Sequence, residues 1–204
     1  MAAGSLHPVG HLPTVLDQVV STLAARDAEL RLEQAVRGID HLTEVGLQAL
    51  IGEGLAAHHR VTREAYYPSA VADKRGRARC DFVLTPQGQA LHDDCAPEEA
   101  LWLELKVAHQ LLPEGRRNPR YGQQWRASLL ADLRKMKTDP LIRHAALALV
   151  VFNDSRTTLE KDAALFETIL ASEQLLCGFR SQRSFSIEDR IGHAVCGAMM
   201  WPLL

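Results

Sequence analysis

One strand-like segment, Leu101 to His109, constrains the fold of this chain more than any other. Its leucines and its valine alternate with a second set of side chains that includes Trp102, Glu104 and Lys106. Alternation with a period of two is the signature of a β-strand, and so apolar a strand is typical of the centre of a sheet covered on both faces. A carboxylate and an amine side by side on such a face are costly to bury. The segment therefore predicts a polar site on the sheet.

A second strand, predicted over residues 78–85, brings another carboxylate to this site. Asp81 interrupts its short apolar run, and the connection to the next strand is rich in residues that form turns, such as Pro86, Gly88 and Pro97. We expect the two strands to form an antiparallel hairpin. The hairpin would place Asp81 near Glu104 and Lys106 and make the three side chains one constellation.

The remaining periodicities predict an α/β protein with a single domain over residues 1–204. The domain has a loose tail at 1–13, a helical extension at 14–37, a core at 43–152 and C-terminal additions at 153–204. The core is predicted to run in the order helix 43–59, strands 60–67, 78–85 and 100–108, helix 123–138 and strand 145–152. Thr14 and Gly38 are the expected ends of the helical extension, with a bend after Arg26. The additions are predicted to be a helix at 158–175 and edge strands at 185–187 and 194–201.

The helix predicted at 43–59 offers one more acidic residue to the site. At 100° per residue, Glu44 falls on the face that carries Leu47, Ile51 and Leu55, whereas Glu53 points the opposite way. A glutamate in the first turn can also act only by stabilising the helix dipole. We therefore expect Glu44, and not Glu53, to lean over the Asp81 and Glu104 site, with the dipole as the alternative.

These residues resemble a known family. Asp81, a gap and then Glu104-Leu105-Lys106 are similar to the signature of the PD-(D/E)XK nuclease superfamily, which is restriction-endonuclease-like, and the resemblance covers residues 43–152. Cys80 stands where that signature has an optional proline. The resemblance implies an αβββαβ core with a central mixed sheet flanked by helices. It leaves the N-terminal helix and the C-terminal elements as additions to that core.

The resemblance also implies a chemistry. It predicts a nuclease that cleaves nucleic acid with Mg²⁺ or Mn²⁺, acting on DNA rather than RNA and as an endonuclease rather than an exonuclease. Asp81, Glu104 and the carbonyl of Leu105 would hold the ion, because hard oxygen donors suit these metals. Lys106 would orient or help to deprotonate the attacking water, and Glu44 would complete the site.

A basic segment offers a surface for nucleic acid. Between Glu104 and Arg143 the chain carries nine Lys and Arg against four Asp and Glu, although its overall charge is −2. Arg116, Arg117 and Arg120 are the expected phosphate contacts, with a plain solvated basic face as the alternative. The family resemblance adds Gln124 and Lys135, because family members often place a polar or basic residue of this helix near the scissile phosphate.

Composition limits the other classes of function. The four cysteines form no Cys-x-x-Cys pair, so a structural zinc site is not expected. The longest apolar run, residues 145–152, is too short to span a membrane, and the N-terminus lacks the pattern of a signal peptide, so we expect a cytoplasmic protein without membrane partners.

Two alternatives stay open at this level. The chain could be a catalytically silent module for nucleic-acid binding or assembly, in which Glu104 and Lys106 form a buried salt bridge. Copies of the chain could also pair as a homodimer, and the segment at 14–37 could serve either packing or self-association.

Overall fold

The computed structural model describes residues 11–69 and 79–204, apart from the side chains of Trp125, Ala127 and Ser128. Within this part of the chain, six strands form one mixed sheet in the order β1-β2-β3-β4-β6-β5. The pair of β3 and β4 is parallel, and the other neighbours are antiparallel. The strands are β1 (Arg60–Tyr66), β2 (Arg79–Thr85), β3 (Leu101–His109), β4 (His144–Asn153), β5 (Ser181–Ser186) and β6 (Val195–Pro202).

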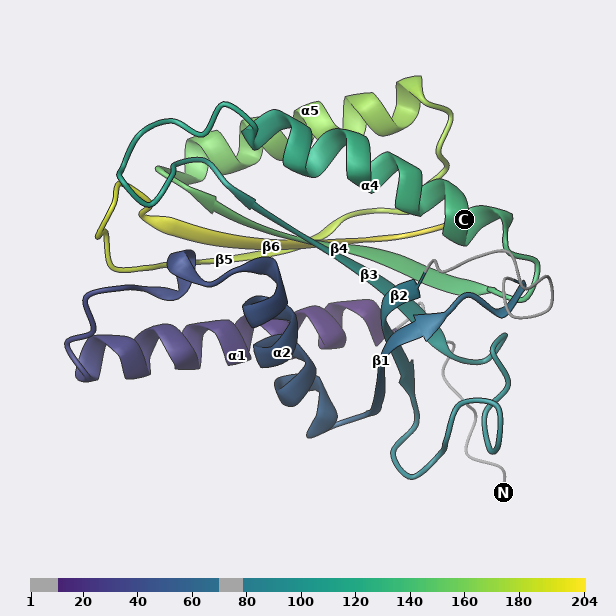
Figure 1. Cartoon of the computed structure of the whole chain (residues 1–204). Coiled ribbons are helices and arrows are strands. Elements are labelled where there is room, and N and C mark those ends of the chain that lie inside the picture. Colours follow the sequence, from purple (N-terminus) through teal and green to yellow (C-terminus); the bar gives the residue numbers. More distant parts are fainter. Residues whose placement is uncertain (1–10, 70–78) are drawn as a thin grey trace.

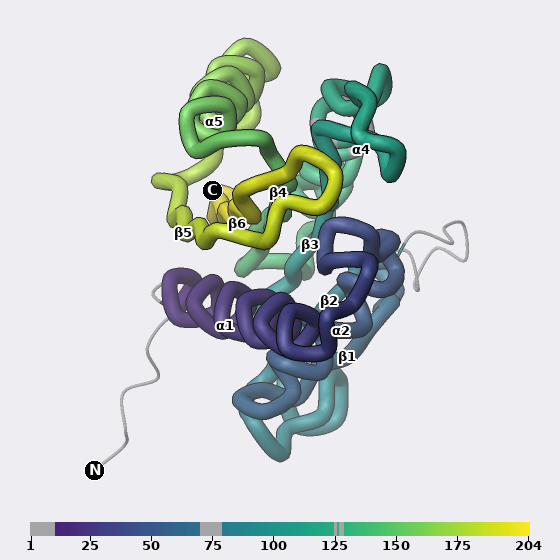
Figure 2. The backbone as a smooth tube through the Cα atoms, turned by 90° about the vertical axis from the view of Figure 1, so that its left-hand side faces the viewer, coloured from purple at the N-terminus to yellow at the C-terminus, as the bar shows by residue number. Residues whose placement is uncertain are grey.

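Helices cover both faces of the sheet. Helices α1 (Leu12–Leu32) and α2 (Glu44–Ala56) lie on one face, whereas α4 (Tyr121–Thr138) and α5 (Arg156–Ser172) lie on the other (Figure 1, Figure 2). A short 3-10 helix, Ile39–His41, leads into α2. The protein is therefore a three-layer α/β structure, as the sequence predicted, with a separate hydrophobic core on each side of the sheet.

Strand β3 divides its side chains between the two cores. Its leucines and Val107 pack with α1 and α2, whereas Trp102 and Ala108 pack with α4 and α5. This division is the direct result of the alternation in the sequence, because successive side chains of a strand point to opposite faces. Glu104 and Lys106 consequently lie on the face that α4 covers.

The elements of the predicted core are confirmed within a few residues. Helix α2 follows Thr43, whose hydroxyl accepts a hydrogen bond from the amide of Gly46 at 3.2 Å and caps the helix. Strands β2 and β3 pair in antiparallel fashion, as expected for the hairpin. Helix α4 ends at Thr138, just before Asp139 and Pro140, because proline disfavours helix in the residue that precedes it.

The N-terminal extension differs from its prediction in both of its ends. Helix α1 begins at Leu12, with Pro13 in its first turn, so Leu12 and Pro13 belong to the helix and not to a tail. It is a single helix and ends at Leu32, well before Gly38. Gln34 takes a left-handed φ of 50°, and the amide of Ala35 donates to the carbonyl of Leu30 at 2.9 Å, which closes the helix in a Schellman turn.

The C-terminal additions complete the sheet. Helix α5 begins after Ser155, whose hydroxyl accepts from the amide of Thr158. Strand β5 forms an edge as predicted, but β6 does not, because it lies between β4 and β5 and is buried along its whole length. Its apolar sequence suits an interior strand.

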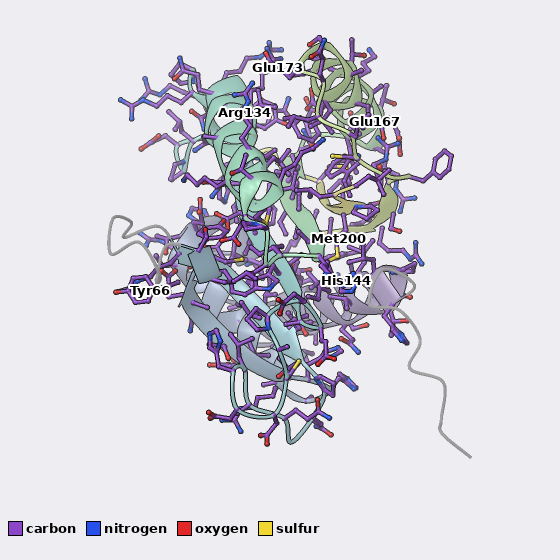
Figure 3. All side chains as sticks on the ribbon, turned by 90° about the vertical axis from the view of Figure 1, so that its right-hand side faces the viewer. Tyr66, Arg134, His144, Glu167, Glu173 and Met200 are labelled. Carbon is purple, nitrogen blue, oxygen red and sulfur yellow. The ribbon has the colours of Figure 1, made fainter. Side chains whose placement is uncertain are left out.

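An ion pair between Arg134 and Glu173 joins α4 to the residue that follows α5 (Figure 3). Residues 1–10 of the predicted tail lie outside the described residues, as does the charged segment 73–77, for which the sequence predicts a turn.

The contact between α1 and α2 depends on a glycine. A Cβ atom at Gly54 would lie 2.9 Å from the Cβ of Thr22 on α1, which is too close for either helix to accommodate without moving. At Gly46, on the same helix, a Cβ would meet its nearest neighbour at an ordinary 3.5 Å.

We therefore predict that Gly54→Ala destabilises the fold by about 1 to 3 kcal/mol, measured by urea unfolding, because the two helices must separate. Gly46→Ala is the matched control. Alanine favours helix over glycine by up to about 1 kcal/mol, so this variant should be as stable as the wild type or more so. Equal effects of the two substitutions would contradict the close approach of α1 and α2.

Candidate active site

The site begins with Asp81, at the point where β2 stops pairing with β3. The paired residues of the two strands run from Leu84 and Leu101 to Phe82 and Leu103, and Asp81 is the next residue of β2. Its Oδ2 accepts a hydrogen bond from the amide of Leu105 at 2.7 Å, so the side chain takes the place of a backbone carbonyl. Its Oδ1 accepts from Nε2 of Gln48 at 2.8 Å. The carboxylate is thus fixed between β3 and α2.

The backbone around Asp81 is unusual. In β1, Glu64 takes a left-handed φ of 52°, between the pairs that Arg63 and Ala65 make with β2. At the same level, the side chains of β2 change the face of the sheet to which they point, since Phe82 packs with α1 and α2 whereas Cys80 packs with α4 and α5. A left-handed residue inside a strand stores strain, and such strain often marks a functional site.

Glu104 and Lys106 lie next to each other on the face that α4 covers. Glu104 is only 4 % exposed, and its Oε1 accepts from Nζ of Lys106 at 3.3 Å. Lys106 also forms an ion pair with Oδ2 of Asp132 at 3.0 Å, and Lys135 reaches Oδ1 of Asp132 at 2.7 Å. Charges of opposite sign therefore alternate from Glu104 through Lys106 and Asp132 to Lys135.

The two carboxyl groups on the strands are hard to ionise. Burial and the nearby charge of Asp81 raise the pKa of Glu104 to about 8, although Lys106 lowers it in part. Burial likewise raises the pKa of Asp81 to about 6, against the hydrogen bond from Leu105 and the charge of Lys106. The two carboxyl groups oppose each other's ionisation in a poorly solvated place, and a bound cation would relieve this repulsion.

Lys106 on β3 and Asp132 on α4 show the opposite behaviour, because their neighbours favour the charged form of each. Burial alone would lower the pKa of Lys106, but Glu104 and Asp132 raise it above its usual range. Burial alone would raise the pKa of Asp132, but hydrogen bonds from Lys135 and Lys106 hold it below its usual range. Lys106 is therefore a firmly protonated ammonium group at neutral pH.

Glu44 lies in the first turn of α2, near these groups. It is exposed, but nearby protein atoms partly desolvate it and raise its pKa, with a lowering effect from Lys106 and a raising effect from Asp132. Its charge also raises the pKa of Asp81. Glu53, on the same helix, is exposed. Glu44 is coupled electrostatically to the site residues, but its side chain is exposed rather than buried on the core-facing side of α2.

The residues predicted to contact nucleic acid are placed in different ways. Arg116, Arg117 and Arg120 are exposed in the loop before α4. Gln124 instead holds this loop, because its Oε1 accepts from the side-chain amide of Asn118 at 3.0 Å and from the backbone amide of His109 at 3.4 Å. Lys135 is exposed and reaches the site through Asp132.

Two residues of the site were not predicted, namely Gln48 and Asp132. Gln48 is buried between Leu47 and Ile51, so a polar residue on an apolar face was its signal. Asp132 precedes Lys135 by three residues on α4, which was a sign of an ion pair.

The donor set fits the ion that the family resemblance implies. Among the described residues, no three His, Cys, Asp or Glu side chains form a cluster that could hold a metal ion. The expected set is smaller, with two carboxylates and the carbonyl of Leu105. Glu104 Oε2 is buried and has no hydrogen-bond partner in the described chain, so a hard acceptor is free beside Asp81. These oxygen donors suit Mg²⁺ or Mn²⁺.

Comparisons of the chain with family models, with curated proteins and with solved structures gave no match. No helix in the described ranges combines the length and apolar character that a membrane crossing requires.

The raised pKa of Glu104 predicts how stability depends on pH. Without metal, the folded protein keeps a proton on Glu104 up to a pKa of about 8, whereas the unfolded chain releases it near the ordinary value of 4.5. The folded state therefore binds more protons between these pH values, so the free energy of unfolding falls as the pH rises from about 4.5 to about 8.

Glu104→Gln should remove this part of the pH dependence, because the amide does not ionise and Lys106 keeps Asp132 as a partner. Urea unfolding at several pH values in the presence of a chelator measures the effect. Parallel curves for the wild type and the variant would show that Glu104 ionises normally in the folded protein.

Proposed function

We propose that this chain is a metal-dependent nuclease with a restriction-endonuclease-like core. The observation that carries the proposal is the convergence of Asp81, Glu104 and Lys106, from two adjacent strands, on one poorly solvated site with a free carboxylate oxygen. The order α2-β1-β2-β3-α4-β4 and the parallel pair of β3 and β4 support that core. Its substrate is DNA rather than RNA, cut internally and in the cytoplasm.

Each residue has a distinct part in the proposed reaction. Asp81, Glu104 and the carbonyl of Leu105 hold Mg²⁺ or Mn²⁺, which when bound lowers the pKa of a water molecule and offsets the charge of the phosphate. Lys106 remains protonated, so it orients the attacking water and neutralises a phosphate oxygen rather than acting as a base. Asp132 holds the ammonium group in place, and Glu44 adds negative charge at the mouth of the site.

A second candidate is a catalytically silent module that binds nucleic acid or assembles with other chains. The observation that favours it is the pairing of Lys106 with both Glu104 and Asp132, which would also suit a purely structural network. Such a network usually stabilises no more than apolar residues of similar volume, and it needs no free carboxylate oxygen. We therefore place the nuclease first.

The catalytic residues are tested by cleavage of linear, circular and single-stranded DNA and of RNA, with Mg²⁺ or Mn²⁺. We expect Lys106→Ala and Glu104→Gln to reduce the cleavage rate by about 100-fold or more, because charge stabilisation and water activation are lost. Glu53→Gln, on the exposed face of α2, should cleave as the wild type does. Far-UV circular dichroism checks that each variant is folded, and full activity of folded Lys106→Ala would refute the proposed role of this lysine.

The metal site is tested separately by thermal unfolding with chelator and with Mn²⁺. The ion binds the folded state, so it should raise the melting temperature of the wild type. Asp81→Asn removes one ligand together with a repulsive charge, so it should be at least as stable as the metal-free wild type but gain little from Mn²⁺. A destabilised Asp81→Asn and a wild type indifferent to Mn²⁺ would favour the silent module.

The basic loop is tested by reversing Arg116, Arg117 and Arg120 to Glu. All three are exposed, so the change should weaken DNA binding about equally for different sequences and should flatten its salt dependence, by about 0.9 in the log-log slope for each lost phosphate contact. The charge-matched control reverses Arg37, Arg156 and Lys161, which are also exposed but lie after α1 and on α5. If both triple variants bind alike, the contact surface lies elsewhere.

A further inference from the structure

The C-terminal flank of the domain carries an apolar groove with a volume of about 540 Å³, between α5, the segment that follows α5 and the end of the chain. Its wall includes the buried residues Leu170, Leu175 and Trp201. None of the residues that line the groove belongs to the site on β2 and β3. An apolar groove that opens to solvent is typical of a surface that binds another apolar group.

Three exposed apolar side chains line the same groove. Phe179 is 99 % exposed, and Leu176 and Leu204 are 65 % and 69 % exposed. Among the described residues, Phe179 is the most exposed of the large apolar side chains. A single exposed leucine is ordinary in a folded protein, but three such residues around one apolar groove form a contiguous patch. Such a patch is shielded from water only when another molecule covers it.

The backbone holds Phe179 in a fixed position. On one side, the amide of Gly178 donates to the carbonyl of Pro202 at 2.8 Å. On the other side, Arg180 forms an ion pair with Glu167 of α5 at 3.4 Å (Figure 3 labels Glu167). The ring is therefore presented from a backbone that is already ordered, so little conformational entropy is lost when a partner covers it.

We propose that this patch is the interface of a homodimer, in which Phe179 of each copy enters the groove of the other. The exposed ring and the groove lie on one face of the chain, because Phe179 itself lines the groove. A two-fold axis can therefore pair each ring with one groove, and such a contact closes at two copies. The inference does not depend on the proposed nuclease activity.

The exposed area fits a small but specific interface. A covered aromatic side chain buries about 200 Å², so two copies of Phe179 supply about 400 Å². A specific interface needs about 1,200 Å² in total, counted over both partners. Leu176 and Leu204 of each copy, and the surface that all of these side chains cover, are available to supply the rest. We therefore expect a dimer that dissociates in the micromolar range.

Sedimentation equilibrium of the full chain, from micromolar to sub-millimolar concentration, tests the dimer. The wild type should pass from monomer to dimer and go no further, because the two-fold contact closes. Phe179→Glu should raise the dissociation constant by about 100-fold or more, because both aromatic anchors are lost and a carboxylate enters a groove that Glu167 lines. A wild type that stays monomeric would overturn the proposal and leave the groove to a different protein. Growth beyond the dimer would overturn the two-fold contact.

Leu32→Glu is the matched control. Leu32 is 85 % exposed at the end of α1, which covers the opposite face of the sheet from α5 (Figure 2). The same gain of charge at this position should leave the dissociation constant unchanged. If both variants dissociate alike, the effect belongs to charge in general, and Phe179 is not the anchor of the interface.

Ala171→Trp tests the groove without changing Phe179. Ala171 is exposed on α5 and lines the groove, so a tryptophan fills the space that the ring of the second copy needs. This variant should weaken the dimer as Phe179→Glu does, and far-UV circular dichroism checks that both variants are folded. A dimer that tolerates Ala171→Trp but not Phe179→Glu would show that Phe179 contacts a different surface, which contradicts the reciprocal insertion.

Discussion

The hydrogen bond from the amide of Leu105 to the carboxylate of Asp81 is the interaction on which the rest of the site depends. It lies where β2 leaves β3, and a side chain there satisfies a backbone amide that a strand would otherwise pair. A buried backbone amide without a partner lowers the stability of the fold. Because Asp81 accepts from this amide, the two strands can separate here with little loss of stability. Gln48 fixes the other oxygen of the same carboxylate from α2. Asp81 thereby links the sheet to α2 at the site.

The second constraint is the burial of charge between the sheet and α4. Glu104, Lys106, Asp132 and Lys135 alternate in sign, so each charge that is withdrawn from water gains an opposite neighbour. The hydrogen bonding of this network is incomplete at Glu104. Its second oxygen has no partner in the described chain, and its pKa is raised to about 8. A purely structural network would be expected to satisfy all of its members. This unpartnered oxygen of Glu104 is the observation that favours the proposed metal site over a structural salt bridge.

Local patterns in the sequence predicted the fold well. The alternation along β3 predicted a central strand with different neighbours on its two faces, and the three-residue to four-residue periodicity of α2 placed Leu47 and Ile51 in the core. Predictions were poorest where local rules competed. Helix α1 ends at a Schellman turn formed by Gln34, although Gly38 was the stronger local stop signal, and β6 is an interior strand although its place at the end of the chain suggested an edge.

The sequence by itself determined the α/β class, the order of the core elements and the approach of Asp81 to Glu104 and Lys106, because these follow from periodicity and from turn residues between two strands that pair in antiparallel fashion. Only the tertiary structure decided which more distant residues complete the site. Asp132 reaches Lys106 from α4, and Gln48 reaches Asp81 from α2. A sequence pattern specifies which face of an element is apolar, but which side chains meet across two packed elements depends on how those elements are positioned, and that is fixed only by the packing of the whole core.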